Sequence, residues 1–484
     1  MSTTIEHSVT PPIAPMPAVD TLPDAQPMSS LYRVVWRWHF YAGLFTVPFL
    51  LMLALTGTII MFQNELNDLV YRHQHVVTPG ERMLPYDEQL ARVQQAYPEM
   101  SVVLVQPSWA ADRSTMVMLT DDAGADVSAF VDPYTGALLG DRDNTRTLTG
   151  VANTMHGTFL LGDWGDRMIE IAAGWAIVLT VSGLYLWWPR KGSKVWGVLL
   201  PRLGTTNPRV WWRDLHAVPA VWTSGLLLLT LISGMTWTGF WGEMTQVWST
   251  FPAAMWDEVP ESTALTRSLN TPSTQVSPWA TEAQPLPESE HAGHSTGGAE
   301  GVRAGQIGLD QVITIARRES APQRFNISLP ADERGVYTVS ASSAGAELDD
   351  ATQERLVHID QYSGAVLANI GWNEYSGVAK AVAMSIAIHE GKQFGLINRI
   401  ATLLLIATII GSTITGVVMW WRRRPTGRIG APTMPKSVRL WKGAVAIMLV
   451  LGVVFPLVGA SLLTVLLLDF LIIRRVPVLK RVIG

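Results

Sequence analysis

The feature that most constrains the fold of this chain is a set of long apolar blocks that contain no charged residue. The hydrocarbon core of a bilayer is about 30 Å thick, so a helix needs about 20 residues to cross it. Backbone groups inside hydrocarbon must pair with one another, which makes helices the natural structure for such blocks. The sequence therefore predicts a polytopic α-helical membrane protein. The blocks cover residues 40–64, 171–189, 217–242, 400–421 and 443–468.

The last block belongs to a longer segment that is interrupted near its middle. The segment from Val438 to Ile473 contains Pro456 and Gly459, and basic residues flank both of its ends. Because cytoplasmic loops carry the excess of lysine and arginine, such flanks favour a hairpin that returns to the face it left. We expect two short helices here, which gives six transmembrane helices, with five as the alternative.

Lysine and arginine also set the predicted orientation of the chain. They cluster before the first block, between the second and third blocks, and after the fourth block. By the positive-inside rule these segments and both termini are cytoplasmic. The two long segments at about 65–165 and 243–388 then lie on the opposite side of the membrane.

The cysteine count and the missing motifs narrow the possible chemistry. The chain has no cysteine, which excludes iron–sulfur clusters, thiolate zinc sites, covalently attached c-type haem and disulfides. It has no P-loop or dinucleotide-binding glycine motif, and no cytoplasmic segment long enough for a flavin or nicotinamide domain. A redox role would therefore need a separate cytoplasmic or quinol electron donor. No nucleic-acid partner is expected.

Four histidines at the edges of the apolar blocks form two pairs that are related in sequence. His39 and His216 each precede a hydroxyl–glycine dipeptide, and their segments match at a constant offset of 177. His156 and His389 each begin a segment that ends in Trp-Trp, and these match at an offset of 233. Imidazole beside hydrocarbon is costly unless it has a partner, so intramembrane histidines are candidate functional residues. The pattern predicts two bis-histidine sites, and the usual occupant of such a site in a membrane is haem b.

The positive-inside rule gives each predicted site a place and a set of cations. It puts His39 and His216 at the cytoplasmic mouth of their spans, and His156 and His389 on short segments at the outer face. Interfacial histidines bonded to water or lipid head groups are the alternative, and Met155 could supply a thioether ligand in place of His156. Cations near the propionates would hold a haem in place; the candidates are Arg37 and Arg213 on the inner side and Arg167 and Arg399 on the outer side.

The two long segments outside the membrane repeat one another. Each has a helical stretch, then strand-like runs, then an Asp-x-x-x-Gly turn, at 132–136 and 360–364, that suits a tight hairpin. The repeating unit is a helix, an α+β module, a histidine segment and a second helix. The predicted helices are 86–96 and 308–318, and the predicted strands are 101–105, 116–120, 129–131, 325–329, 335–340 and 354–359.

Residues 260–305 break this pattern. They are rich in Pro, Ser, Thr, Gly, Glu and Ala, a composition that predicts a disordered insertion. His291 and His294 within it could bind a metal ion weakly, although a flexible loop with incidental histidines explains them as well.

Two further sets of residues have simpler interpretations. His73, His75 and His358 have no counterpart in the repeat and are expected at surface or strand positions. Four hydroxyl residues that are each followed by glycine are expected to mark close helix packing; they are Thr56, Ser182, Ser233 and Thr415.

Taken together, segments 33–44, 156–162, 182–190 and 389–395, His216 and the two Asp-x-x-x-Gly turns resemble the PepSY-associated transmembrane helix family. This group of iron-regulated membrane proteins includes ferric-siderophore reductases. The chain departs from the pattern at the 260–305 insertion and at Trp421, which is followed by arginine rather than proline.

The resemblance implies a bacterial inner-membrane protein with two haem b groups, one near each face. Their axial ligands would be His39 with His216 and His156 with His389. Electrons would pass from the cytoplasmic side to a periplasmic ferric siderophore, whose chelate weakens when the iron becomes Fe(II). The alternatives are a regulator of a periplasmic peptidase and a proton or metal transporter that uses the four histidines.

The expected fold is thus a polytopic α-helical membrane protein of about six helices, with an internal repeat and two periplasmic α+β PepSY-like modules. The expected organisation is a disordered cytoplasmic tail at 1–30, spans at 31–64, 166–189 and 214–242, modules at 65–165 and 243–388, a cytoplasmic loop at 190–213, a fourth span with its histidine segment at 389–421, and a hairpin at 438–474.

Overall fold

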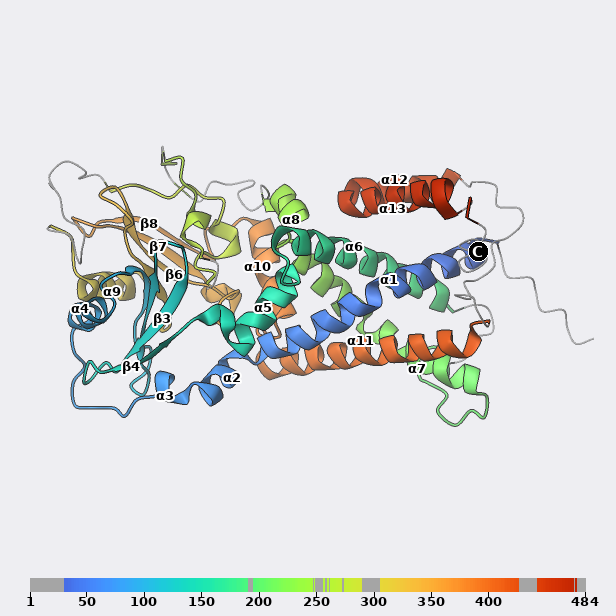
Figure 1. Ribbon diagram of the computed structural model, residues 1–484, viewed down its shortest axis with the longest axis horizontal. Coiled ribbons are helices and arrows are strands. Elements are labelled where there is room, and N and C mark those ends of the chain that lie inside the picture. The colour runs from blue at the N-terminus through green and yellow to red at the C-terminus, as the bar shows by residue number, and fades with distance from the viewer. Residues whose placement is uncertain are drawn as a thin grey trace, which may run out of the picture.

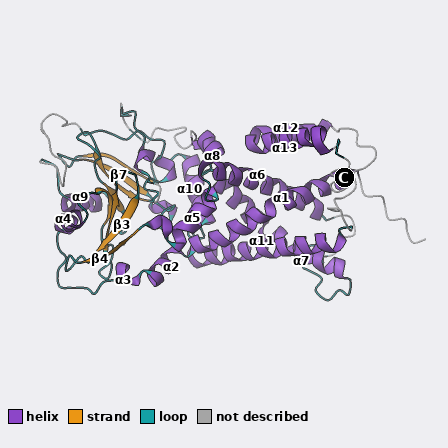
Figure 2. Ribbon diagram, viewed as in Figure 1, coloured by secondary structure: helices purple, strands orange, loops and turns teal. Residues whose placement is uncertain are grey.

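The computed structural model has two parts: a bundle of long helices, and an antiparallel sheet at one end of it (Figures 1 and 2). We call the end of the bundle next to the sheet the sheet side and the opposite end the far side. The predicted tail at 1–30 lies, except for its last residue, outside the described part of the chain. The described residues are 30–189, 195–246, 248, 256, 259–260, 262–271, 274–289, 305–425, 442–473 and 475–476.

Four helices among the described residues are long and apolar enough to cross a membrane. Helices α1 and α7 run from the far side to the sheet side, and α6 and α11 run back (Figure 1). Helix α1 packs against α6 and α11, and α7 packs against the same two helices. The helices are α1 (Ser30–Met61), α6 (Gly162–Trp187), α7 (Pro208–Met235) and α11 (Gly395–Arg423).

The C-terminal segment forms the predicted hairpin from two short helices, α12 (Lys442–Val454) and α13 (Pro456–Leu468). Proline begins α13, the position where its missing N–H costs nothing. Helix α13 lies against α6, where the indole of Trp175 donates to Ser461 at 2.9 Å. At 13 residues α12 is about 20 Å long, too short to cross a bilayer alone. The apolar stretch Pro456–Ile472, which contains α13, is also shorter than the four long helices. The six-helix prediction is therefore not confirmed.

The two modules predicted from the sequence form one continuous eight-stranded antiparallel sheet. The strand order is β4-β3-β2-β1-β5-β6-β7-β8, so each half is a four-stranded meander. The halves join through β1 and β5, where Leu104 lies opposite Ser328. The strands are β1 (Ser101–Gln106), β2 (Thr115–Thr120), β3 (Asp126–Val131), β4 (Leu138–Arg142), β5 (Asn326–Ser328), β6 (Val336–Ala341), β7 (Arg355–Asp360) and β8 (Val366–Gly371).

The same order of elements occurs in both halves of the sheet. A helix precedes each meander, and both helices, α4 (Tyr86–Ala96) and α9 (Leu309–Arg318), cover one face. The main core lies there, because alternate residues of every strand point to the same side. It includes Val117, Val339 and Val357, all nearly inaccessible to solvent.

Short helices connect the sheet to the bundle. Helix α5 (Leu148–Thr158) follows β4, and α10 (Gly377–His389) follows β8. The edge strands of the sheet therefore lead into the helices that carry His156 and His389. The remaining short elements are α2 (Gln63–Val70), α3 (Arg72–His75), α8 (Gly239–Gln246), η1 (Asn144–Arg146), η3 (Thr266–Leu269), η4 (Trp279–Thr281), η5 (Ala351–Gln353) and η6 (Asp469–Ile473).

The predicted disorder at 260–305 is wrong for the described residues between 262 and 289. Leu265 and Pro285 form an antiparallel bridge, and Thr266 and Ala280 are fully buried. The indole of Trp279 donates to the carbonyl of Thr236 at 3.3 Å, which ties the segment to the end of α7. A few apolar residues anchor a segment whose overall composition is polar. His291 and His294 lie outside the described residues.

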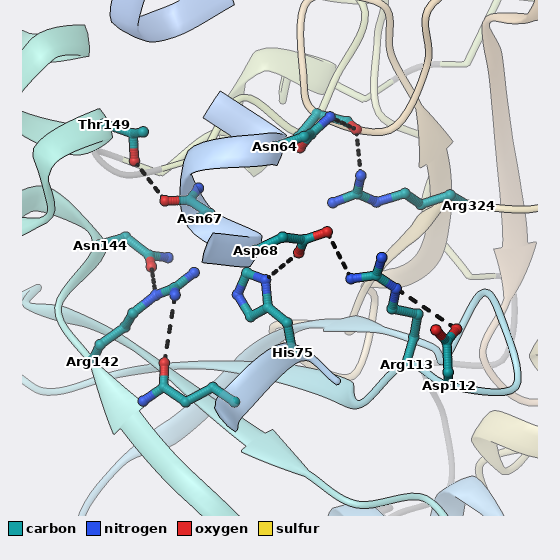
Figure 3. Close-up of polar contacts among 12 residues, drawn as sticks. Asn64, Asn67, Asp68, His75, Asp112, Arg113, Arg142, Asn144, Thr149 and Arg324 are labelled. Atoms are coloured by element: carbon teal, nitrogen blue, oxygen red, sulfur yellow. Dashed lines mark hydrogen bonds and ion pairs between the residues drawn. The ribbon is translucent and has the colours of Figure 1, made fainter. Parts of the chain in front are cut away.

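Polar contacts fasten α2, which follows α1, to both halves of the sheet (Figure 3). Asp68 on α2 accepts hydrogen bonds from Nδ1 of His75 at 2.9 Å and from Arg113, between β1 and β2, at 2.8 Å. Partial burial works to raise the pKa of Asp68, but these two donors hold it below its usual value. Asn64 donates to the carbonyl of Ala346 in the second half at 3.4 Å.

Two further contacts tie the helices that carry His156 and His389 to their surroundings. Thr149 on α5 donates to Asn67 on α2 at 3.1 Å (Figure 3). Lys392, just after α10, is buried and donates to the carbonyls of Ser343 at 3.0 Å and Gly345 at 2.7 Å, in the loop after β6. The sheet-side end of the bundle is thus joined to the sheet by the chain and by hydrogen bonds.

Candidate functional site

The structure brings the four histidines together as two pairs inside the bundle. On the far side, the ring centroids of His39 on α1 and His216 on α7 are 6.4 Å apart, with an interplanar angle of 87°. On the sheet side, the rings of His156 on α5 and His389 on α10 are also 6.4 Å apart, with an angle of 62°. We call these the far-side pair and the sheet-side pair. Each ring is half-buried.

The two pairs lie at opposite ends of the bundle. Helix α1 touches both of them, because it carries His39 of the far-side pair and its Thr56 contacts His156 of the sheet-side pair at 2.9 Å. The part of α1 from His39 to Thr56 is about 26 Å long at the helical rise of about 1.5 Å per residue. This length is slightly less than the hydrocarbon thickness of about 30 Å. The pairs are therefore placed near the two faces of a membrane that the bundle would cross.

Interruptions of the helices let the sheet-side histidines reach the bundle interior from short helices. Helix α5 ends at Thr158, and Phe159 and Leu160 take the left-handed conformation before α6 starts at Gly162. The φ values of Phe159 and Leu160, 51° and 57°, are unusual for residues with side chains. Gly395 begins α11 with φ of 56°, the same value as Gly162. The short segments predicted for His156 and His389 are therefore present, and the first ends at its capping residue Phe159, just before Gly162.

In all four histidines, Nδ1 is the nitrogen that contacts a neighbouring helix. Each contact is with the hydroxyl of one of the four hydroxyl–glycine dipeptides, at 2.9–3.3 Å. The contact leaves Nε2 of each ring as the nitrogen that a metal could use. The contacts are His39 with Ser182 at 3.0 Å, His156 with Thr56 at 2.9 Å, His216 with Thr415 at 3.3 Å, and His389 with Ser233 at 3.1 Å.

The separation within each pair fits one metal ion between two imidazoles. An imidazole nitrogen lies about 2 Å from a first-row metal ion and about 1 Å from the centre of its own ring. Two rings on opposite sides of one ion would then have centroids about 6 Å apart, close to the observed 6.4 Å. Across the described residues there is no cluster of three or more His, Cys, Asp or Glu side chains that could hold a metal ion. Each site thus offers two protein ligands, the number that a haem requires.

The four arginines proposed from sequence as propionate partners have other partners within the protein. Arg213 is 2.7 Å from the buried carboxylate of Asp214, and Arg37 lies over the ring of Tyr41 at 5.1 Å. On the sheet side, Arg167 is 3.0 Å from Asp166 and Arg399 is 2.6 Å from Glu65. Three of the four are therefore already neutralised by carboxylates of the chain, which weakens their assignment to a propionate.

Sequence reasoning missed one arginine near the far-side pair. Arg423, at the end of α11, lies within electrostatic range of His216 and 5.7 Å from the ring of Trp36. It belongs to the basic run after the fourth span, which the sequence used only for orientation. The signal was its position about two turns after Thr415, along one face of the same helix.

His358 and the two histidines after α1 lie apart from these pairs. His358 occupies β7, as a strand position, but it is fully buried rather than at the surface. Its Nδ1 contacts the hydroxyl of Thr338 at 2.9 Å, and its ring lies parallel to that of Trp256. His75 binds Asp68, and His73 is exposed.

The described residues include four helices that are long and apolar enough to cross a membrane, with a sheet at one end. They define a polytopic α-helical membrane protein with an attached α+β module. The chain is matched over residues 36–423 by the family model described as the PepSY-associated TM region. The chain therefore belongs to this family. No curated protein matches the sequence.

Proposed function

We propose that this protein is a di-haem b electron carrier that passes electrons from the far side of the membrane to an acceptor on the sheet side. The observation that carries the proposal is the presence of two histidine pairs with the same 6.4 Å separation, about 26 Å apart along the bundle. A single histidine pair could be explained by hydrogen bonds within the bundle. Two matched pairs near opposite faces would give electrons a path across it.

The residues that would hold the two cofactors are the four histidines. His39 and His216 would ligate one through Nε2, and His156 and His389 the other, while the Nδ1 contacts keep each ring from rotating. Haem iron, when bound, supplies a one-electron Fe(III)/Fe(II) couple. The surrounding helices would exclude water from the path and keep the dielectric constant low.

The acceptor that we propose is a ferric siderophore in the periplasm, with the bundle in the bacterial inner membrane and the far side facing the cytoplasm. The proposal rests on family membership and on the basic residues at the far side, including Arg202 and Arg213. One electron reduces each Fe(III) to Fe(II), which binds hard oxygen ligands less tightly and is released. A quinol as donor would give up two electrons and two protons and would reduce two ferric ions; a soluble one-electron reductant would serve equally.

The test is a reduced-minus-oxidised absorption spectrum of the purified protein and of four variants with His39, His156, His216 or His389 changed to alanine. The wild type should bind two haems per chain. His39→Ala and His216→Ala should lose the same haem, and His156→Ala and His389→Ala the other, because each pair shares one iron. The exposed His73→Ala is the matched control and should retain both haems.

Two outcomes would count against the proposal in different ways. A colourless wild-type protein would refute electron transfer through haem, and would favour a regulatory or transport role. A coloured protein whose losses pair differently, for example His39 with His156, would refute the ligand assignment. Reduction of a ferric siderophore by proteoliposomes that contain the protein then tests the acceptor.

A further inference from the structure

We infer that the four hydroxyl–glycine dipeptides are positioning elements for the histidine ligands, in which each hydroxyl fixes the protonated nitrogen, and Gly183 and Gly234 also admit the ring. The dipeptides are Thr56-Gly57, Ser182-Gly183, Ser233-Gly234 and Thr415-Gly416. This inference rests on the proposed function, since it assigns a role toward the bound haem. From the sequence, these residues were expected only to mark close helix packing.

The hydroxyl proton of each dipeptide is already used within its own helix. Thr56 donates to the carbonyl of Met52 at 2.9 Å, and Thr415 donates to the carbonyl of Gly411 at 2.8 Å. Ser182 and Ser233 donate in the same way to residues one turn earlier, at 2.9 and 3.2 Å. A hydroxyl has one proton and two lone pairs, so each oxygen can only accept from the histidine that it contacts.

An oxygen that can only accept requires a proton on the histidine nitrogen facing it. Nδ1 of each histidine is therefore protonated, and Nε2 keeps the lone pair that a metal needs. Backbone carbonyls reinforce this state on the far side, where Nδ1 of His39 is 3.1 Å from the carbonyl of Leu179 and that of His216 is 3.0 Å from the carbonyl of Ser412. An acceptor at Nδ1 also makes Nε2 a stronger donor to the metal.

A glycine follows each hydroxyl residue beside the ring, and at Gly183 and Gly234 the missing side chain gives the ring room to approach the helix backbone. A Cβ atom built on Gly183 would lie 3.1 Å from Cε1 of His39, and one on Gly234 would lie 3.3 Å from Cε1 of His389. The corresponding distances at Gly57 and Gly416 are 3.4 and 3.5 Å. All four glycines face the histidine that their neighbouring hydroxyl holds, which would be unexpected if they served helix packing alone.

The dipeptides also distribute the two sites over the four spanning helices. Helix α1 carries His39 of the far-side pair but holds His156 of the sheet-side pair, and α7 carries His216 but holds His389. Helices α6 and α11 hold His39 and His216. A change in Thr56 should therefore affect the site at the opposite end of the membrane from the histidine on the same helix.

The experiment is a redox titration of haem absorbance in Thr56→Val and Thr415→Val, which keep the shape of threonine and remove its oxygen. Thr56→Val should raise the midpoint potential of the sheet-side haem and leave the far-side haem unchanged, because a weaker donor stabilises ferric iron less. Thr415→Val should raise only the far-side potential, and by less, since the carbonyl of Ser412 still accepts from His216.

Two kinds of control separate positioning from a general structural effect. Thr56→Ser and Thr415→Ser restore the oxygen and should restore both potentials. Thr408→Val is matched to Thr415→Val, because Thr408 lies on the same helix and donates to the carbonyl of Leu404 at 2.8 Å. It should leave both potentials unchanged.

The outcomes distinguish this inference from the proposed function. If the wild type binds two haems but Thr56→Val moves neither potential, or moves that of the far-side haem, the positioning role is refuted and the electron path stands. If Thr56→Val does not fold, Ser233→Ala and Ser233→Thr test the same site through His389. A wild type without haem would refute both proposals together.

Discussion

The two histidine pairs have the same ring separation of 6.4 Å but are supported by different parts of the molecule. Both members of the far-side pair lie on spanning helices, and backbone carbonyls contact their Nδ1 atoms. Both members of the sheet-side pair lie on short helices that continue from edge strands of the sheet. The geometry of the far-side pair depends on the bundle alone, whereas that of the sheet-side pair also depends on the sheet.

The two pairs therefore suit different steps of the proposed electron transfer. In the proposed function, electrons would enter at the far-side pair, which does not depend on the sheet. They would leave at the sheet-side pair, whose helices are tied to α2 by Thr149 and to the loop after β6 by Lys392.

Removal of either pair should stop electron flow, but at different points along the path. In proteoliposomes, His216→Ala and His389→Ala should each lower the rate of acceptor reduction by more than about 100-fold, since loss of a ligand exceeds the effect of losing its hydrogen-bond partner. A reductant added on the sheet side should still reduce the remaining haem of His216→Ala. Normal flow in either variant would contradict the division into entry and exit sites.

The ion pairs at the two ends should differ in their contribution to stability. Asp214 is buried at the far side, where Arg202 donates to it at 2.7 and 3.0 Å. Because Arg202 is partly exposed, Asp214→Ala should cost about 2–3 kcal/mol, between surface and buried pairs. Glu65 is half exposed on the sheet side, and Glu65→Gln should cost less than about 1 kcal/mol. Thermal unfolding in detergent measures both, and equal losses would contradict the expected order.

Acid should disturb the sheet-side pair before the far-side pair. Burial lowers the pKa of His358 from 6.5 to about 3, so below pH 6.5 the unfolded chain binds a proton that the folded sheet does not. Stability of the sheet should therefore fall by about 1.4 kcal/mol for each pH unit between 6.5 and 3. The absorbance of the sheet-side haem should be lost at a higher pH than that of the far-side haem.

His358→Gln is the variant that tests the cause of this acid sensitivity. It should flatten the pH dependence of tryptophan fluorescence below pH 6.5, because the buried titrating group is gone. His73→Gln is the control at an exposed position and should leave the dependence unchanged. An unaltered slope in His358→Gln would assign the acid sensitivity to other groups.

Two glycines beside the far-side pair should differ slightly in their tolerance of alanine. A Cβ at Gly183 would lie 3.1 Å from His39, whereas one at Gly416 would lie 3.5 Å from His216, an ordinary contact. Gly183→Ala should lower the ratio of far-side haem to protein, but several times less than the loss of a histidine ligand does. Gly416→Ala should leave this ratio unchanged. A larger loss in Gly416→Ala would show that the distances do not control ring placement.

The sequence indicates the histidine pairs but not the residues that hold them. The offsets of 177 and 233 group the histidines because duplicated segments keep their internal spacing. The contact between His156 and Thr56 joins two different helices, and no spacing within one segment encodes it. The arginine assignments depend on proximity to the histidines in sequence, and they overlook Asp214, the neighbour of Arg213 along the chain. The contact of Arg399 with Glu65 joins residues 334 positions apart, and no local pattern reveals it.

The sheet shows the same division between local and long-range information. Alternating patterns predict β1, β2, β6 and β7 closely, and the periodicity of 86–96 gives α4 with the same bounds. The pairing of Val105 with Ile327 joins strands that are far apart in the sequence, and a local pattern contains no sign of it. The composition of 260–305 is likewise an average, and it hides the few apolar side chains, such as Val276 and Trp279, that become buried.

The attachment of α5 and α10 to opposite edges of one sheet has a mechanical consequence. Strands β4 and β8 are separated by seven inter-strand spacings, about 34 Å at 4.8 Å each, yet the rings at the ends of the two helices approach to 6.4 Å. The two helices converge from opposite edges of the sheet toward the histidine pair. A change in the twist of the sheet should therefore alter the angle between the rings of His156 and His389. By thermodynamic linkage, any molecule whose binding changes that twist must bind with an affinity that depends on the state of the histidine pair.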